Sequence, residues 1–240
     1  MSSSLEVHPG VWLDARRAVW LAAARALLLA DLHLGYPWVE RQRGRLFPLV
    51  DDDVAARLAA LIADYQPAVV ALLGDVLHAR VGLEAVRAEL DTVLAAVPPA
   101  AELVWLAGNH DRGRGPGLTW QGRTLELRER HELDGHLFTH GDGGSWGELQ
   151  PRLGRRGLVF MGHEHPAVRL GDGVATDVKA PAFLVGDRLV VLPAFPNWAG
   201  GGTWGDGPPL PRLAAAAGPL RPVAIPGQRL LRLQGWAGHE

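Results

Sequence analysis

The sequence predicts a layered α/β fold whose functional side chains lie just beyond the ends of buried strands. Short apolar runs stop abruptly at Gly, Asp, Asn or His, helix-like segments alternate with them, and most histidines lie in short polar blocks of this kind. Continuous apolar runs of this length suit strands buried on both faces, as in sheets that helices cover. Ligands of such folds bind beyond the carboxyl ends of the strands.

The predicted elements follow in order along the chain. Strands are expected at 26–30, 68–73, 103–107 and 158–161. A helix is expected at 51–64, where three aspartates suited to capping precede apolar residues at helical spacing. A second helix, at 83–97, ends at two prolines because proline cannot continue a helix. Beyond residue 162 we expect antiparallel pairing, with a hairpin of 182–185 and 188–192 around Gly186 and Asp187.

We expect a single domain over residues 1–240, because one hydrophobic core serves a chain of 240 residues. The segment 196–240 is rich in Gly and Pro and contains Trp198, Trp204 and Trp236. It is predicted to be irregular, with one final strand at 229–233. Tryptophans of this kind can pack inside the protein or anchor an oligomer or partner interface.

Composition excludes several classes of protein. With 48% hydrophobic and 21% charged residues the chain is not disordered, and the absence of cysteine excludes disulfides, a thiol nucleophile and sulfur-ligated metals. The formal net charge of −2 does not indicate a nucleic-acid binder by itself. The apolar run 18–30 is interrupted by Arg25 and is too short to span a bilayer. We therefore expect a cytoplasmic protein with no membrane partner.

Six of the ten histidines lie in five short blocks at or just past the ends of predicted strands. The blocks are Asp31-Leu32-His33, Gly74-Asp75-Val76-Leu77-His78, Gly108-Asn109-His110-Asp111, Thr139-His140-Gly141-Asp142 and Gly162-His163-Glu164-His165. Residues two apart in an extended or looped segment point to the same side, so Asp31 with His33, and His163 with His165, can each bind one metal centre or a neighbouring pair. The blocks offer seven oxygen or nitrogen donors: Asp31, His33, Asp75, Asn109, His140, His163 and His165. One catalytic ion cannot use seven, whereas two ions sharing a carboxylate can, which predicts a binuclear centre.

These five blocks, in this order, resemble the calcineurin-like metallophosphoesterase superfamily, and the resemblance spans residues 31–165. It implies an α/β/β/α sandwich of two mixed sheets flanked by helices. It also implies that the first metal is held by Asp31, His33, Asp75 and His165. Asp75 then bridges to a second metal, which is held also by Asn109, His140 and His163.

The same resemblance assigns catalytic roles. His110 faces the scissile phosphate as a general acid or as a stabiliser of charge, and Asp111 orients His110. His78 either contacts the reacting site or has a structural role next to the residues that do. Two cations about 3.5–4 Å apart can acidify a bridging water toward hydroxide for in-line attack on phosphorus. No covalent intermediate is expected. Manganese is the first expectation for the metal, with Fe or Zn²⁺ as alternatives that the ligand set also accepts.

Further stretches resemble a bacterial branch known as ligase-associated DNA-damage-response endonucleases. They are 30–35, 74–78, 104–112, 162–166 and 191–195. The branch implies a DNA endonuclease in repair that works with a ligase, helicase or exonuclease. The chain departs from the branch after Phe195, where Pro196-Asn197-Trp198 stands in place of Gly.

Five arginines are candidates for binding a phosphodiester backbone, because they follow metal-binding blocks: Arg41, Arg43, Arg45, Arg112 and Arg114. A solvated helix face is the alternative. Trp38 and Phe47 can stack on a base or pack in a lid. Asp142 can orient His140 or form a local turn, and Glu164, between two ligands, is expected to face solvent.

Two other functions fit the same blocks. One is a phosphodiesterase or pyrophosphatase for small nucleotides or a lipid-linked diphosphate, which would need a hydrophobic cap. Only about thirty residues separate Asp111 from His140, which leaves little room for one. The other is a non-catalytic scaffold on the same fold, against which the retention of His110 and of all seven donors argues.

Overall fold

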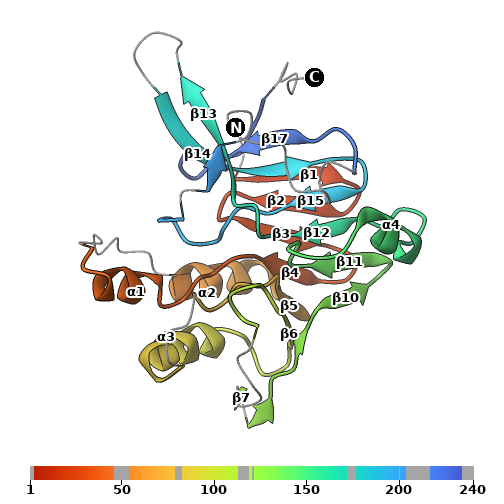
Figure 1. Cartoon of the computed structure of the whole chain (residues 1–240). Coiled ribbons are helices and arrows are strands. Elements are labelled where there is room, and N and C mark those ends of the chain that lie inside the picture. Colours follow the sequence, from red (N-terminus) through yellow and green to blue (C-terminus); the bar gives the residue numbers. More distant parts are fainter. Residues whose placement is uncertain are drawn as a thin grey trace.

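The computed structural model describes residues 3–45, 54–78, 83–112, 119–120, 122–171, 177–199, 201–203 and 217–233. Two mixed β-sheets face each other and form the centre of the molecule (Figure 1). Their common core contains Leu28 and Ala71 from one sheet and Phe138, Phe160 and Phe183 from the other.

The first sheet has the strand order β1-β2-β3-β4-β5-β6-β9 among the described residues. Its strands are β1 (Ser4–His8), β2 (Val11–Asp14), β3 (Ala18–Leu21), β4 (Ala26–Leu29), β5 (Val69–Leu72), β6 (Glu102–Leu106) and β9 (Leu127–Arg128). The first four form an antiparallel meander, and β4, β5, β6 and β9 run parallel. Four neighbouring parallel strands therefore end at one edge.

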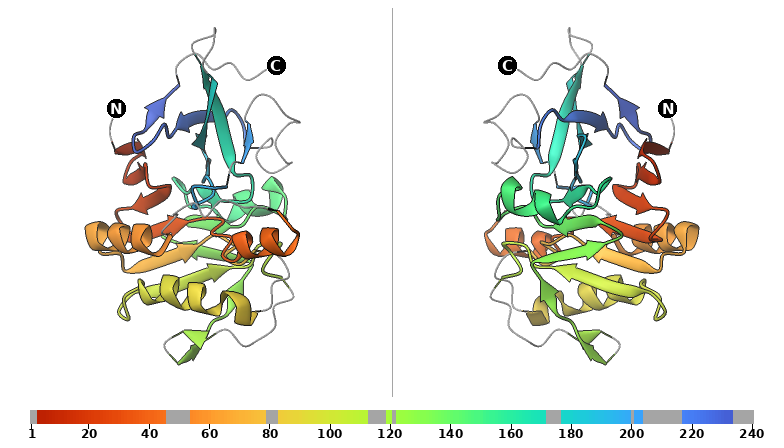
Figure 2. Two further views of the ribbon diagram at one scale, coloured as in Figure 1. Left: turned by 90° about the vertical axis from the view of Figure 1, so that its left-hand side faces the viewer. Right: turned by 90° about the vertical axis from the view of Figure 1, so that its right-hand side faces the viewer.

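The second sheet has the order β10-β11-β12-β15-β14-β13-β16. These strands are β10 (Arg130–Leu133), β11 (His136–Thr139), β12 (Val159–Met161), β15 (Leu189–Val191), β14 (Asp177–Val185), β13 (Pro166–Gly171) and β16 (Gly202–Thr203). β11, β12 and β15 run parallel, and β17 (Arg221–Ala224) joins β14 and β18 (Leu231–Arg232). The hairpin of β13 and β14 extends away from the rest of the molecule (Figures 1 and 2). A separate small pair consists of β7 (Thr119–Trp120) and β8 (Arg123–Thr124).

Helices cover both outer faces. They are α1 (Tyr36–Gln42), α2 (Val54–Tyr65), α3 (Leu83–Ala95), α4 (Trp146–Leu149) and the 3₁₀ helix η1 (Gln150–Arg152). On the first sheet, Leu58 and Leu61 of α2 pack with Leu27 of β4 in one buried cluster. On the second sheet, Leu149 of α4 packs with Met161 of β12. Figure 1 shows α1, α2 and α3 grouped on one side of the molecule and α4 beside the second sheet.

The predicted α/β/β/α layering is confirmed, although the described helices over the second sheet are short. The four predicted strands correspond to β4, β5, β6 and β12, and the two helices to α2 and α3, with residues 51–53 outside the described part. The predicted hairpin is the antiparallel pair of β14 and β15. No helix in the described part of the chain is long and apolar enough to cross a membrane.

Candidate metal centre

Two sets of parallel strands bring the five blocks together at one edge of the sandwich. β4, β5 and β6 end just before the blocks that begin at Asp31, Gly74 and Gly108, while β11 and β12 end just before His140 and Gly162. Cross-sheet hydrogen bonds join the two groups of loops. Asp31 Oδ2 accepts from the backbone N of His163 at 2.9 Å, and Nδ1 of His140 lies 2.9 Å from the carbonyl oxygen of Leu73.

Five of the predicted ligands adopt a left-handed backbone conformation, with φ between 44° and 70°: Asp31, His33, Asp75, His163 and His165. Positive φ is uncommon for residues other than glycine, and such strained residues concentrate at functional sites. We expected an extended or a looped backbone for these pairs, and the structure has the looped form. Side chains two apart converge because the chain turns at each of these residues.

The first donor set consists of Asp31, His33, Asp75 and His165. Nε2 of His33 lies 3.1 Å from Nε2 of His165 and 4.0 Å from Oδ2 of Asp75. Nε2 of His165 lies 3.4 Å from Oδ1 of Asp31. Ligands about 2.0–2.2 Å from a common ion lie about 3.0–3.5 Å from one another, so most of these spacings suit one coordinated cation.

The second donor set consists of Asp75, Asn109, His140 and His163. Nε2 of His140 lies 3.2 Å from Oδ1 of Asn109, 3.2 Å from Nδ1 of His163 and 3.5 Å from Oδ2 of Asp75. Oδ2 of Asp75 is therefore common to both sets. The structure brings all seven predicted donors together.

Burial and charge at this edge fit a pair of divalent cations. Asp31 and Asp75 are buried, and Oδ1 of Asp31 has no hydrogen-bond partner in the described part of the chain. Burial disfavours protonation of His140, yet hydrogen bonding to Asp75 and the charge of Asp31 outweigh it and raise its pKa to about 9. Burial likewise opposes ionisation of Asp75, but contact with His140 holds its pKa at about 2. Two buried carboxylates thus attract positive charge, which bound cations would supply.

His140 is oriented for ligation by its second ring nitrogen. Its Nδ1 lies 2.9 Å from the carbonyl oxygen of Leu73, an acceptor, so Nδ1 carries the proton and donates. In the metal-free protein Nε2 faces Asp75 as a donor, and a bound cation would displace that proton and take the Nε2 lone pair. Histidine ligands in proteins are commonly fixed in this way by a hydrogen bond from the other nitrogen.

Two glycines allow the loops to approach the carboxylates closely. A Cβ atom at Gly108 would lie 2.1 Å from Oδ1 and 2.4 Å from the backbone N of Asp75. A Cβ atom at Gly162 would lie 2.4 Å from Oδ2 of Asp31. Any larger residue at either position would displace a donor.

His110 and Asp111 follow the donor Asn109 in the same loop. Nε2 of His110 lies 3.8 Å from Oδ2 of Asp75, its side chain is 32% exposed, and its backbone N donates to Oδ1 of Asp75 at 2.8 Å. The buried carboxylate of Asp111 accepts from the backbone N of Leu77 and of Gly108, both at 3.1 Å. Asp111 therefore fixes the loop that carries His110, and its predicted effect on His110 would act through that loop.

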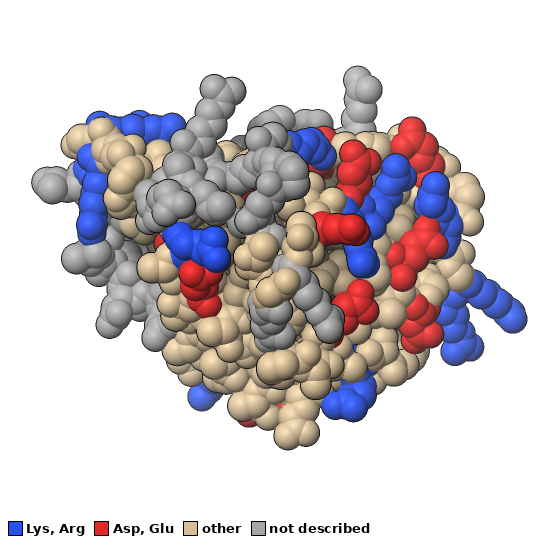
Figure 3. Space-filling view, turned by 90° about the horizontal axis from the view of Figure 1, so that it is seen from below, with Lys and Arg blue, Asp and Glu red and all other residues tan. Residues whose placement is uncertain are grey.

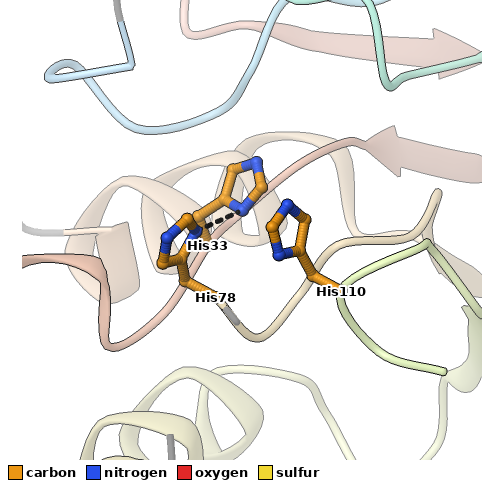
Figure 4. Close-up of side chains that lie close together, drawn as sticks. All are labelled: His33, His78 and His110. Carbon is orange, nitrogen blue, oxygen red and sulfur yellow. Dashed lines mark hydrogen bonds between the residues drawn. The ribbon is translucent and has the colours of Figure 1, made fainter. Parts of the chain in front are cut away.

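His78 lies against the first donor set. Its Nδ1 is 3.2 Å from Nδ1 of His33, and its ring stacks on the ring of His110 with centroids 4.9 Å apart (Figure 4). Burial lowers the pKa of His78 to about 4. The nitrogens of His33, His78 and His110 form a close group of their own.

The candidate substrate-binding arginines that the structure describes are largely engaged in ion pairs. Arg43 and Arg45 each pair with the buried carboxylate of Glu40, at 2.9 and 2.8 Å. Arg112 pairs with Asp142 through both Nη atoms, at 2.5 and 2.9 Å. Arg41 is exposed on α1, and Arg114 and Phe47 lie outside the described residues. Asp142 was predicted to orient His140 or to form a local turn, and its ion pair with Arg112 was not predicted.

An aromatic pair that was not predicted lies beside the first donor set. Tyr36 and Trp198 stack with centroids 4.4 Å apart and planes 6° apart. The Trp198 ring lies 6.4 Å from that of His33, and the Tyr36 ring meets His78 edge-on at 4.6 Å. Trp198 belongs to the departure from the endonuclease branch, which was the available signal.

Glu164 was predicted to face solvent, but it is only partly exposed. Its Oε1 is buried without a hydrogen-bond partner among the described residues, and burial raises the pKa of Glu164 to about 7. The left-handed turns at His163 and His165 remove the simple alternation on which that prediction depended.

Comparison with solved structures identifies the fold. The crystal structure of a nuclease, MPE, from Pseudomonas putida matches with a TM-score of 0.65 and 24% identity, covering 96% of this chain and 98% of that one. A phosphoesterase from E. coli, Yfce, matches with a TM-score of 0.42 and 17% identity, covering 86% of this chain and 96% of that one. No family model matches the sequence, and no curated protein matches it significantly. The nuclease structure and this chain share a fold, which is the layered fold that the sequence predicts.

Proposed function

We propose that the chain is a divalent-metal-dependent phosphodiesterase that cleaves DNA. The observation that carries this proposal is Oδ2 of Asp75, which lies within 4.0 Å of donors from both sets and of Nε2 of His110. When bound, two divalent cations supply positive charge that acidifies water and neutralises phosphoryl oxygens.

The residues at the centre divide the remaining work. Oδ1 of Asp75 accepts the backbone N–H of His110, which leaves Oδ2 directed at both donor sets. His110 is partly exposed beside that oxygen, where it can donate a proton to the leaving oxygen or stabilise developing charge. The carboxylates at the centre would be taken up as metal ligands, so we propose water as the nucleophile and no covalent intermediate.

Three features support a nucleic-acid substrate. The fold neighbour from Pseudomonas putida is a nuclease. The stacked pair of Tyr36 and Trp198 lies beside His33, where aromatic rings can hold a base. A hollow of about 220 Å³ beyond the end of β11 is lined by Arg112 and Arg130 and also by Asp142 and Glu129, so a phosphate there would compete with Asp142 for Arg112. From the sequence alone we also propose manganese as the metal. On the same basis we propose a repair role beside a ligase, helicase or exonuclease, and a cytoplasmic location.

The charge distribution indicates that DNA would be bound mainly near the metal centre. On the face drawn in Figure 3, Lys and Arg side chains are interspersed with Asp and Glu side chains. A net charge of −2 agrees with this mixture. Affinity for DNA must then come from the metal centre and a few arginines, which predicts weak, salt-sensitive binding.

The test compares substrates and one variant. With added Mn²⁺ the protein should hydrolyse bis-p-nitrophenyl phosphate, and kcat/KM on single-stranded or nicked DNA should exceed that on cyclic nucleotides and dinucleotide polyphosphates. His110→Ala should lower turnover by about two to four orders of magnitude with metal content unchanged. Turnover of one small molecule with no cleavage of any DNA would replace the nuclease proposal with the small-substrate alternative.

A further inference from the structure

We propose that His78 is a positioning residue that fixes the ring of His33 for metal ligation by accepting a hydrogen bond from Nδ1 of His33. This inference rests on the proposed function, because it needs a cation at the first donor set. It replaces a direct role of His78 in the reaction with a specific action on one ligand.

The position of His33 determines which of its nitrogens faces the cation. Nε2 lies 3.1 Å from Nε2 of His165 and 4.0 Å from Oδ2 of Asp75, so Nε2 belongs to the donor set. The other ring nitrogen, Nδ1, lies 3.2 Å from Nδ1 of His78 (Figure 4). A neutral imidazole has one N–H and one lone pair.

These two facts set the direction of the hydrogen bond. Ligation requires the lone pair on Nε2 of His33, so the proton of His33 must lie on Nδ1. Nδ1 of His33 therefore donates, Nδ1 of His78 accepts, and the proton of His78 lies on its Nε2. The opposite direction would place a proton on Nε2 of His33 and block ligation.

The second donor set contains the same arrangement with a different acceptor. Nδ1 of His140 donates to the carbonyl oxygen of Leu73 at 2.9 Å, while Nε2 faces the donors. At His33, Nδ1 of His78 takes the place that a backbone carbonyl oxygen has at His140. His78 and Leu73 thus do equivalent work for the two histidines.

The surroundings of His78 fix its ring. Its backbone N donates to the carbonyl oxygen of Leu34 at 2.8 Å, next to the parallel bridge between Leu34 and Leu77. Its ring stacks on His110 at 4.9 Å and meets Tyr36 edge-on at 4.6 Å. These contacts hold its acceptor nitrogen toward His33.

The variants that test this differ in whether they keep an acceptor. In His78→Asn the amide oxygen can occupy the place of Nδ1, whereas His78→Leu fills similar space with no acceptor. Titration calorimetry with Mn²⁺ gives the affinity of each of the two ions. The Asn109→Ala variant identifies which affinity belongs to the second donor set, because Asn109 is a member of that set. We expect H78L to weaken the first ion about 10–100-fold with the second unchanged, and H78N to stay within about 3-fold of wild type.

A measurement on the unaltered protein keeps the test independent of how the variants fold. In the Zn²⁺-loaded protein, nitrogen NMR should show the proton on Nδ1 of His33 and a scalar coupling across the hydrogen bond to Nδ1 of His78. A proton on Nδ1 of His78 would overturn the proposal. So would wild-type affinities for both ions in H78L, equal losses in H78L and H78N, or a third ion that H78L alone loses.

The outcomes separate this inference from the proposed function. If wild-type protein binds no divalent cation, the proposed function itself fails. If wild-type protein binds two cations and H78L binds both equally well but turns over slowly, the metal centre stands and His78 acts on the substrate instead.

Discussion

At the scale of single residues, the metal centre depends on side chains held in unusual backbone conformations. Asp31, His33 and Asp75 turn in the left-handed region, and Gly108 and Gly162 leave room for the carboxylates. The five blocks were sufficient to predict which residues meet. They could not predict the positive φ values, because the conformation of a non-glycine residue depends on contacts from other strands, such as the bond from His163 to Asp31.

Gly108→Ala should weaken binding of both cations by at least about 10-fold, because its Cβ would collide with the side chain and the backbone N of Asp75. Rotation of the Asp75 side chain cannot relieve the backbone contact. Mn²⁺ titration calorimetry measures the effect, and thermal melting checks the fold. Gly147→Ala is the matched control, since nothing lies within 4 Å of its added carbon. Wild-type affinity in Gly108→Ala would contradict the proposed role of Asp75.

At the scale of elements, the parallel strands were predictable and the antiparallel edge was not. The strands β4, β5, β6 and β12 are continuous apolar runs, so composition alone marks them. The meander β1 to β3 has partly exposed strands, and β3 was not predicted within the run 18–30, which turns before β4 at Arg25, where φ is 47°. The strand β17 and the helix α1 were likewise not predicted, because Gly, Pro and Arg interrupt the apolar pattern of short elements.

The hairpin that leads to His140 contains a histidine whose protonation should affect stability. His136 begins β11, and its Nδ1 accepts the backbone N–H of Leu158 at 3.1 Å. Burial lowers the pKa of His136 below its ordinary value. The unfolded chain then binds a proton more readily, so this contribution to stability is present above about pH 6.5 and is lost as pH falls below it.

His136→Asn keeps an acceptor but removes the titration. In the metal-free protein, denaturant unfolding between about pH 8 and 5 should show the wild-type free energy of unfolding falling more steeply than that of the variant. The two proteins should differ by a constant amount above about pH 7.5, where both side chains are neutral. Parallel curves over the whole range would show that His136 does not act in this way.

At the scale of the whole molecule, the net charge of −2 limits how DNA can be held. We expect the logarithm of the binding constant to fall with the logarithm of salt concentration with a slope of about −3 or shallower, since few phosphates meet arginines. Cleavage-deficient His110→Ala protein allows binding to be measured by fluorescence anisotropy.

Arg112→Ala in the same background should make that slope about 1 shallower if Arg112 contacts a phosphate. Arg232→Ala is the control, because Arg232 hydrogen-bonds the carbonyl oxygen of Glu6 on the strand β1, away from the metal centre. An equal change in both variants, or none in either, would show that Arg112 and its hollow beyond β11 do not bind DNA.

The most direct test of the central claim is anomalous diffraction from crystals grown with Mn²⁺. We predict two peaks about 3.5–4 Å apart on either side of the Asp75 carboxylate. One should lie among Asp31, His33 and His165, and the other among Asn109, His140 and His163. A single peak, or two peaks that do not share Asp75, would contradict the binuclear centre and the chemistry derived from it.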